Sequence, residues 1–150
     1  MTDVTRIWLE TSHHPAFRCA GWAFVRQGVD GLSGAAGGAR HVTPERAVLG
    51  GLAEALKDLP PGAAVEVRTG NRQIAALPGR IAGFAAGEDP PTEDLDLWAQ
   101  LSTALKTARI VTAPPNAFAA AWAELARDKA KATGPFRSAI PKPNLVKAGV

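Results

Sequence analysis

Cysteine is almost absent from this sequence of 150 residues, because Cys19 is the only one. A single cysteine excludes an intramolecular disulfide and fits the reducing cytoplasm, where we expect the protein to reside. Long hydrophobic runs are missing too, since no apolar stretch approaches the ~20 residues of a membrane span. The N-terminal residues lack a cationic segment followed by an apolar one, so we expect neither a secretory signal nor a membrane partner.

Acidic residues are nearly missing from residues 127–150, which hold six lysines and arginines and one acid, Asp128. The whole chain has 17 basic and 14 acidic residues and a net charge of +3, so this region carries +5 and the rest carries −2. A basic tail can bind phosphate backbones through counterion release. The alternative is a solvated extension that only improves solubility.

The composition, 46% hydrophobic and 21% charged, is that of one ordinary globular domain. Apolar alternation predicts five strands, near residues 4–10, 19–26, 39–42, 64–69 and 109–112. Helical spacing predicts a helix over 43–59 ended by Pro60 and Pro61, and a short one over 71–77 stopped by Pro78. Further helices should begin at caps on Thr92 and Asn116, with an irregular connection over 80–93.

This order of elements indicates an α/β layered domain over residues 1–132, a five-stranded mixed sheet flanked by helices. Beyond that point, residues 133–150 hold three prolines, two glycines and three basic residues. We therefore expect residues 133–150 to be a basic, proline-containing tail that is extended or disordered.

Several short segments, in order and spacing, resemble the ribonuclease H family. They are Gly21-Trp22-Ala23 in the second strand, residues 43–56 (TPERAVLGGLAEAL) in the first long helix, residues 96–101 (DLWAQL) and residues 124–127 (ELAR). The resemblance implies a ribonuclease H-like fold. It also implies an activity, the hydrolysis of RNA in RNA/DNA hybrids by two metal ions that a cluster of carboxylates holds.

The four acidic positions of that family are mostly lost in this sequence. Glu10 retains the first, whereas Val48, Gly70 and Ala123 stand where the resemblance places the other three. One carboxylate cannot hold two metal ions, so we expect a catalytically inactive domain with no cofactor. Mg²⁺ or Mn²⁺ would be needed only if a shifted set of acids restored activity; Glu45, Asp94 and Asp96 are the candidates.

Arg68, Arg72 and Arg80 flank the place where the metal cluster would lie. We predict that these arginines bind nucleic acid, such as an RNA/DNA hybrid, together with Lys129 and Lys131 of the basic C-terminal region. Alternatively, the arginines pair with Glu66, Glu88 or Asp89. Two other functions stay open, a protein-interaction or assembly domain and an active, metal-dependent ribonuclease H with a rearranged site. The sequence does not predict the oligomeric state.

Overall fold

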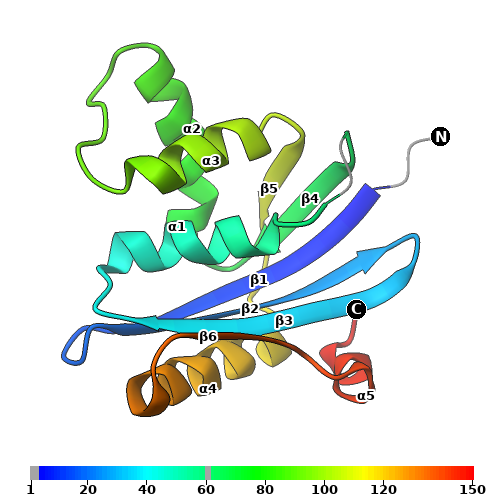
Figure 1. Ribbon diagram of the computed structural model, residues 1–150. Coiled ribbons are helices and arrows are strands. Elements are labelled where there is room, and N and C mark those ends of the chain that lie inside the picture. Colours follow the sequence, from blue (N-terminus) through cyan, green and yellow to red (C-terminus); the bar gives the residue numbers. More distant parts are fainter. Residues whose placement is uncertain (1–3, 60–61) are drawn as a thin grey trace.

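The computed structural model describes residues 4–59 and 62–150, and shows one mixed sheet between two helical layers (Figure 1). Six strands lie in the order β5-β4-β1-β2-β3-β6. β1 is parallel to β4, and β4 to β5, while the remaining neighbours are antiparallel. The strands are β1 (Val4–His14), β2 (Cys19–Gly28), β3 (Gly31–Arg40), β4 (Ala64–Thr69), β5 (Ala108–Thr112) and β6 (Phe136–Ala139).

Three helices cover one face of the sheet, and α4 with the C-terminal segment covers part of the other. The first layer buries a core around Leu9, Leu49 and Trp98, and the second buries a smaller core around Ala23, Val25 and Leu145. The helices are α1 (Pro44–Ala55), α2 (Arg72–Ala85), α3 (Leu95–Ala104), α4 (Ala117–Thr133) and α5 (Lys142–Leu145), followed by a 3-10 turn (Val146–Ala148).

Two helices begin where side-chain capping predicts. Thr43 accepts a hydrogen bond from the amide of Arg46 at 3.1 Å and Pro44 takes the first turn of α1. Asn116 accepts one from the amide of Ala119 at 2.9 Å and so caps α4. Pro60 and Pro61, predicted to end the first helix, lie outside the described residues.

The start of α3 differs from the prediction, because Asp94 and not Thr92 precedes it. Asp94 has a φ of 56° and makes no side-chain hydrogen bond to the helix amides. Its carboxylate instead accepts from Arg46 at 2.8 Å, so an ion pair to α1 fixes where α3 begins.

The glycine- and alanine-rich segment forms the whole of β3, although only residues 39–42 were predicted as strand. A Cβ at Gly37 would overlap the ring of Trp22, and one at Gly38 would lie 2.7 Å from the Cβ of Ala130 on α4. Small residues are therefore required on both faces of β3, because an indole lies over one face and a helix packs on the other.

Pro78 lies inside α2, and the prediction that it ends the helix is wrong. Proline offers no N–H to the carbonyl of Ile74. The helix nevertheless continues to Ala85, because Leu77, Ile81 and Phe84 extend its apolar stripe past the proline onto the first core.

The sheet has six strands and not five, because the C-terminal segment adds one. Phe136–Ala139 pairs antiparallel with β3, and the amide of Ile140 donates to the carbonyl of Gly34 at 2.9 Å. Ile140 and Leu145 are 3% and 1% exposed, so residues that were expected to be extended or disordered are folded onto the second core. The apolar spacing of Ile140, Leu145 and Ala148 was the signal for this packing.

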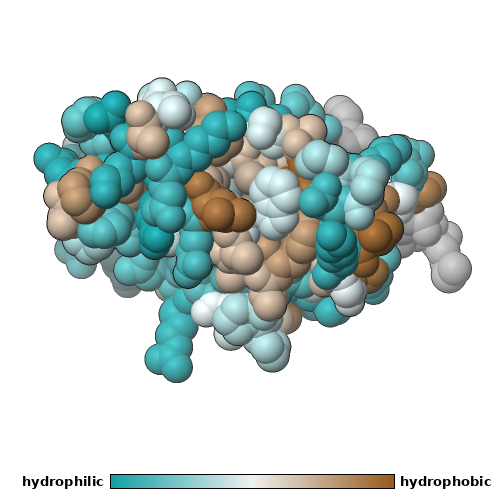
Figure 2. All heavy atoms as spheres, turned by 90° about the horizontal axis from the view of Figure 1, so that it is seen from below, coloured by the Kyte–Doolittle hydropathy of each residue, from teal (hydrophilic) through white to brown (hydrophobic). Residues whose placement is uncertain are grey.

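The face that carries α4 mixes apolar and polar residues. Figure 2 shows apolar side chains gathered in its middle, with hydrophilic ones around them. Phe118 and Trp122 on α4 are only partly buried there, and Leu125 is 65% exposed. No helix among the described residues has the length and apolar character needed to cross a membrane.

Candidate functional site

Glu10 lies within β1, beside the end of β4 and the start of α4. It is 6% exposed, and its Oε2 accepts a hydrogen bond from the amide of Gly70 at 3.0 Å. Burial raises the pKa of Glu10 above its ordinary value, and the amides of Gly70 and Asn116 offset part of that rise. The carboxylate is thus held by backbone donors at a junction of three elements.

Gly70, where the resemblance places a second acid, has no room for a side chain. A Cβ built on Gly70 would overlap Cγ of Pro115 in the loop between β5 and α4. That loop is fixed in turn, because the amide of Ala113 donates to the carbonyl of Thr69 at 2.9 Å. The Pro115 ring therefore occupies the space into which a residue at position 70 would project.

Asn71 closes the other side of the same junction. Its Oδ1 caps α2 by accepting from the amides of Gln73 and Ile74 at 2.8 and 3.2 Å. Its Nδ2 donates to Thr11 Oγ1 at 2.9 Å, which ties β4 and α2 to β1. The polar groups around Glu10 are thus engaged in holding the fold.

The remaining two positions do not supply metal ligands. Val48 is 5% exposed in the first core, and Ala123 is fully buried in the second. α4 opens at Ala117, so Ala123 lies almost two turns beyond the helix start. Asn116, whose amide reaches Glu10, is the residue at that opening.

The acids that could form a shifted site are all in ion pairs with arginines. Glu45 pairs with Arg80 at 2.6 Å, while Asp94 and Asp96 pair with Arg46 at 2.8 and 3.2 Å. Across residues 4–59 and 62–150, no three His, Cys, Asp or Glu side chains come together as a metal site. The residues present do not fit the pair of cations that two-metal hydrolysis requires.

The five predicted nucleic-acid-binding residues lie on three different parts of the surface. Arg80 projects from α2 over the ring of Trp98, at 4.7 Å, in the layer of α1 to α3. Arg68 lies on the opposite face of the sheet, and Arg72 opens α2. Lys129 and Lys131 are on α4, over the rings of Phe136 and Phe17 at 4.5 and 3.4 Å. The structure does not bring these residues together.

The structure instead groups Arg68 with residues that sequence analysis passed over. α4 packs mainly on β1, β2 and β3, which leaves its side of β4 and β5 open. Register places Arg6, Glu66 and Arg109 in one row across three strands, and Trp8, Arg68 and Val111 in the next. We call these six residues the open sheet face. The signal was the strand period, since Val65 and Val67 are buried and their neighbours face outward.

Charge on the open sheet face is positive, because three arginines surround one glutamate. Arg68 Nε is 2.7 Å from Glu66 Oε1, and Arg109 is 3.3 Å from Glu66 Oε2. The hydrogen bond from Arg68, helped by the charges of Arg68, Arg109 and Arg6, lowers the pKa of Glu66. The predicted Arg68–Glu66 pairing is thus present. The Arg109 side chain remains 77% exposed, and Arg68 lies 5.8 Å from the centre of the Trp8 ring.

No protein-family model matches this sequence, and no curated protein matches it. Solved structures do match its fold. The N-terminal RNase H domain of a Mycobacterium tuberculosis protein aligns with a TM-score of 0.65 at 19% identity, over 87% of this chain and 97% of that one. The fold is that of ribonuclease H.

Two further ribonuclease H structures support this assignment. LC9-RNase H1, a type 1 RNase H with the type 2 active-site motif, gives a TM-score of 0.65 at 16% identity, over 100% of this chain and 82% of its own. LC11-RNase H1, solved in complex with an RNA/DNA hybrid, gives a TM-score of 0.60 at 21% identity, over 84% of this chain and 98% of its own. The predicted ribonuclease H-like fold is confirmed. At these identities the likeness concerns the fold alone, and roles of individual residues remain predictions.

Proposed function

We propose that this chain is a nucleic-acid-binding module built on the ribonuclease H fold, without two-metal nuclease activity. Binding is supported by the open sheet face, where Arg6, Arg68 and Arg109 present positive charge beside the Trp8 ring. Arginine guanidinium groups bind phosphates through paired hydrogen bonds, and aromatic rings stack on bases. The LC11 neighbour, which was solved with an RNA/DNA hybrid, makes such a hybrid the first ligand to test.

Loss of catalysis is supported by the junction around Glu10. Glu10 accepts hydrogen bonds from the backbone amides of Gly70 and Asn116, and the Pro115 ring fills the space beside Gly70. A nuclease of this class needs several carboxylates aimed at one place, and the resemblance places Val48, Gly70 and Ala123 at the other acidic positions.

Fluorescence anisotropy with a labelled RNA/DNA hybrid tests the binding. We expect micromolar affinity that falls steeply between about 50 and 200 mM salt, because counterions are released from the phosphates. Arg109→Gln should weaken binding and lower the salt slope by about one. Arg40→Gln, at an exposed arginine that ends β3 toward the other edge of the sheet, is the matched control. Salt-insensitive binding, or no binding at micromolar protein, would contradict the proposal.

A cleavage assay on the same hybrid tests the loss of activity. We expect no product with Mg²⁺ or Mn²⁺ above that of a blank preparation. Metal-dependent cleavage that disappears in Glu10→Ala would instead establish the active alternative.

One observation favours the assembly alternative. Phe118, Trp122 and Leu125 follow one stripe of α4, and the two aromatic rings lie 5.8 Å apart at a partly open surface. Light scattering on nuclease-treated protein distinguishes this function. A dimer that dissociates in Leu125→Lys would support assembly, and a monomer would leave nucleic-acid binding as the better proposal.

A further inference from the structure

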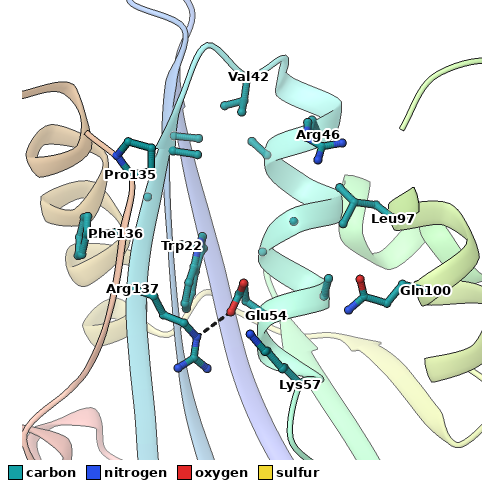
Figure 3. A pocket seen from close by; sticks show the side chains of 17 residues that line it. Trp22, Val42, Arg46, Glu54, Lys57, Leu97, Gln100, Pro135, Phe136 and Arg137 are labelled. Atoms are coloured by element: carbon teal, nitrogen blue, oxygen red, sulfur yellow. Dashed lines mark hydrogen bonds and ion pairs between the residues drawn. The ribbon is translucent and has the colours of Figure 1, made fainter. Parts of the chain in front are cut away.

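A cavity of about 680 Å³ lies between α1 and β6, over the sheet face opposite the open sheet face (Figure 3). α1 and α3 form one wall, and β2, β3 and β6 form the other. It shares no residue with the junction around Glu10. Its size falls within the range of pockets that bury small organic ligands, roughly 300 to 1,000 Å³.

The sheet side of the cavity is flat because of one row of residues. Register aligns Trp22 of β2 with Gly37 of β3 and Arg137 of β6. The indole of Trp22 lies over Gly37, and the Arg137 guanidinium carbon is 5.8 Å from the centre of its ring. The row places the ring of Trp22, which is 8% exposed, in the lining of the cavity near the Arg137 guanidinium, as Figure 3 shows.

Gly50 lies on the side of α1 that lines the cavity, and packing within the protein does not require a glycine there. A Cβ at Gly51 would lie 2.7 Å from Thr11 Cγ2, so Gly51 is needed for packing. A Cβ at Gly50 would meet nothing within 4 Å. Glycine in a helix interior is less stable than alanine, so the fold gains nothing from it. Gly50 lines the cavity, and its missing side chain leaves room there.

At one end of the cavity two cations, Lys57 and Arg137, lie with a single carboxylate, that of Glu54. Glu54 accepts from Arg137 Nε at 2.7 Å, and Arg46 is held by Asp94 and Asp96. Lys57 is exposed at the same end as Arg137, and among the described residues it has no ion-pair partner. An anionic group is therefore favoured at this end, beside the apolar surface of Trp22.

We infer that this cavity binds a nucleoside monophosphate, either free or as an unpaired nucleotide of a strand. The base packs against Trp22 and the small residues of α1, and the phosphate lies between Lys57 and Arg137. Base-aromatic contacts tolerate any base, so recognition comes from the ring and the phosphate together. The choice of a nucleotide rests on the proposed nucleic-acid role, whereas the cavity and its charge do not.

Isothermal titration with AMP, CMP, GMP and UMP tests the inference, with adenosine and inorganic phosphate as separate arms. We expect the monophosphates to bind at least tenfold more tightly than adenosine or phosphate alone. Equal binding of inorganic phosphate would overturn the inference, because the ring of Trp22 would then contribute nothing. Failure of every monophosphate to bind at millimolar concentration would overturn it as well.

Gly50→Leu places the side chain of a good helix former in the cavity, and should lower monophosphate affinity at least tenfold. Gly79→Leu is the matched control, because Gly79 is also inside a helix with nothing within 4 Å of its Cβ position. Circular dichroism confirms that both variants are folded. Monophosphate binding that survives in folded Gly50→Leu, or that is lost equally in Gly79→Leu, would refute the site.

Two hybrids separate the sources of the nucleotide. A hybrid with an unpaired 5′-phosphorylated nucleotide should bind more tightly than a blunt one, and Gly50→Leu should remove that difference if the nucleotide comes from a strand. Equal binding of the two hybrids, with AMP binding retained, assigns the cavity to free monophosphates. Hybrid binding that is lost in Arg109→Gln but unchanged in Gly50→Leu would uphold the open sheet face. If AMP binding were also absent, only the cavity inference would fail.

Discussion

Pro115 packs so closely against Gly70 that position 70 has no room for a side chain. A Cβ on Gly70 would overlap Cγ of Pro115 and lie 2.8 Å from its Cδ. The two residues belong to the end of β4 and the loop before α4, so this contact fixes how the two elements meet. An acid at position 70 would require the loop to move.

Gly70→Ala should therefore lower the free energy of unfolding by about 1–3 kcal/mol, because an added methyl group in a packed site strains its neighbours. Pro115→Ala should recover part of that loss when combined with Gly70→Ala. Urea denaturation of both single variants and the double variant gives the coupling energy. Additive effects of the two changes would show that the proline ring does not exclude a side chain at position 70.

Glu10 should make the protein less stable as the pH rises. Its folded-state pKa is raised above the ordinary value of 4.5, mainly by burial. Its contribution is therefore fully present below the unfolded-state pKa and is lost as the pH rises through the folded-state pKa. The free energy of unfolding of the wild type, relative to Glu10→Gln, should fall across this range in denaturant titrations.

Glu66 is a control for Glu10, because its effect on the free energy of unfolding should change with pH in the opposite direction. Its pKa is lowered by Arg68, so its contribution is present above the unfolded-state pKa and is lost as the pH falls through the folded-state pKa. The wild type should gain stability relative to Glu66→Gln as the pH rises. If both variants gave differences of the same sign, the burial of Glu10 would not control its ionisation.

The α/β architecture could be predicted because local signals agree with tertiary packing. Thr43 and Asn116 cap helices through their own side chains, and the alternation around Val65 and Val67 follows the two faces of β4. β3 was harder to predict, because its glycines are required by packing against Trp22 and α4, which are distant in the sequence. The prediction that Pro78 ends α2 failed for the same reason, because packing on the first core keeps the helix continuous past a residue that disfavours helix.

The sequence predicted one pair of neighbours at the candidate site, although not the geometry around them. Glu10 and Gly70 do meet, as the resemblance implied. Sequence alone could not show that Pro115 fills the space beside them, or that Arg68 joins Arg6 and Arg109, because strand order decides which arginines become neighbours.

The C-terminal segment should be needed for stability. Ile140 is 3% exposed and Leu145 is 1% exposed, and both close the second core beneath the sheet. Leu145→Ala should cost about 2–4 kcal/mol through lost burial and the cavity left behind. Val146→Ala, at a neighbour that is 72% exposed, should change stability by less than about 0.5 kcal/mol. If Leu145→Ala and Val146→Ala lowered the stability equally in thermal unfolding, the C-terminal segment would not be packed in solution.

Arg68 and Arg80 should differ in their effect on nucleic-acid binding, although both were predicted to contribute. Arg68 lies on the open sheet face, while Arg80 pairs with Glu45 in the layer of α1 to α3, on the other side of the sheet. Arg68→Gln should weaken hybrid binding severalfold and reduce its salt slope, because one phosphate contact is lost. Arg80→Gln should leave both unchanged. Anisotropy titrations at two salt concentrations measure this, and a larger loss in Arg80→Gln would move the binding surface to the α1 to α3 layer.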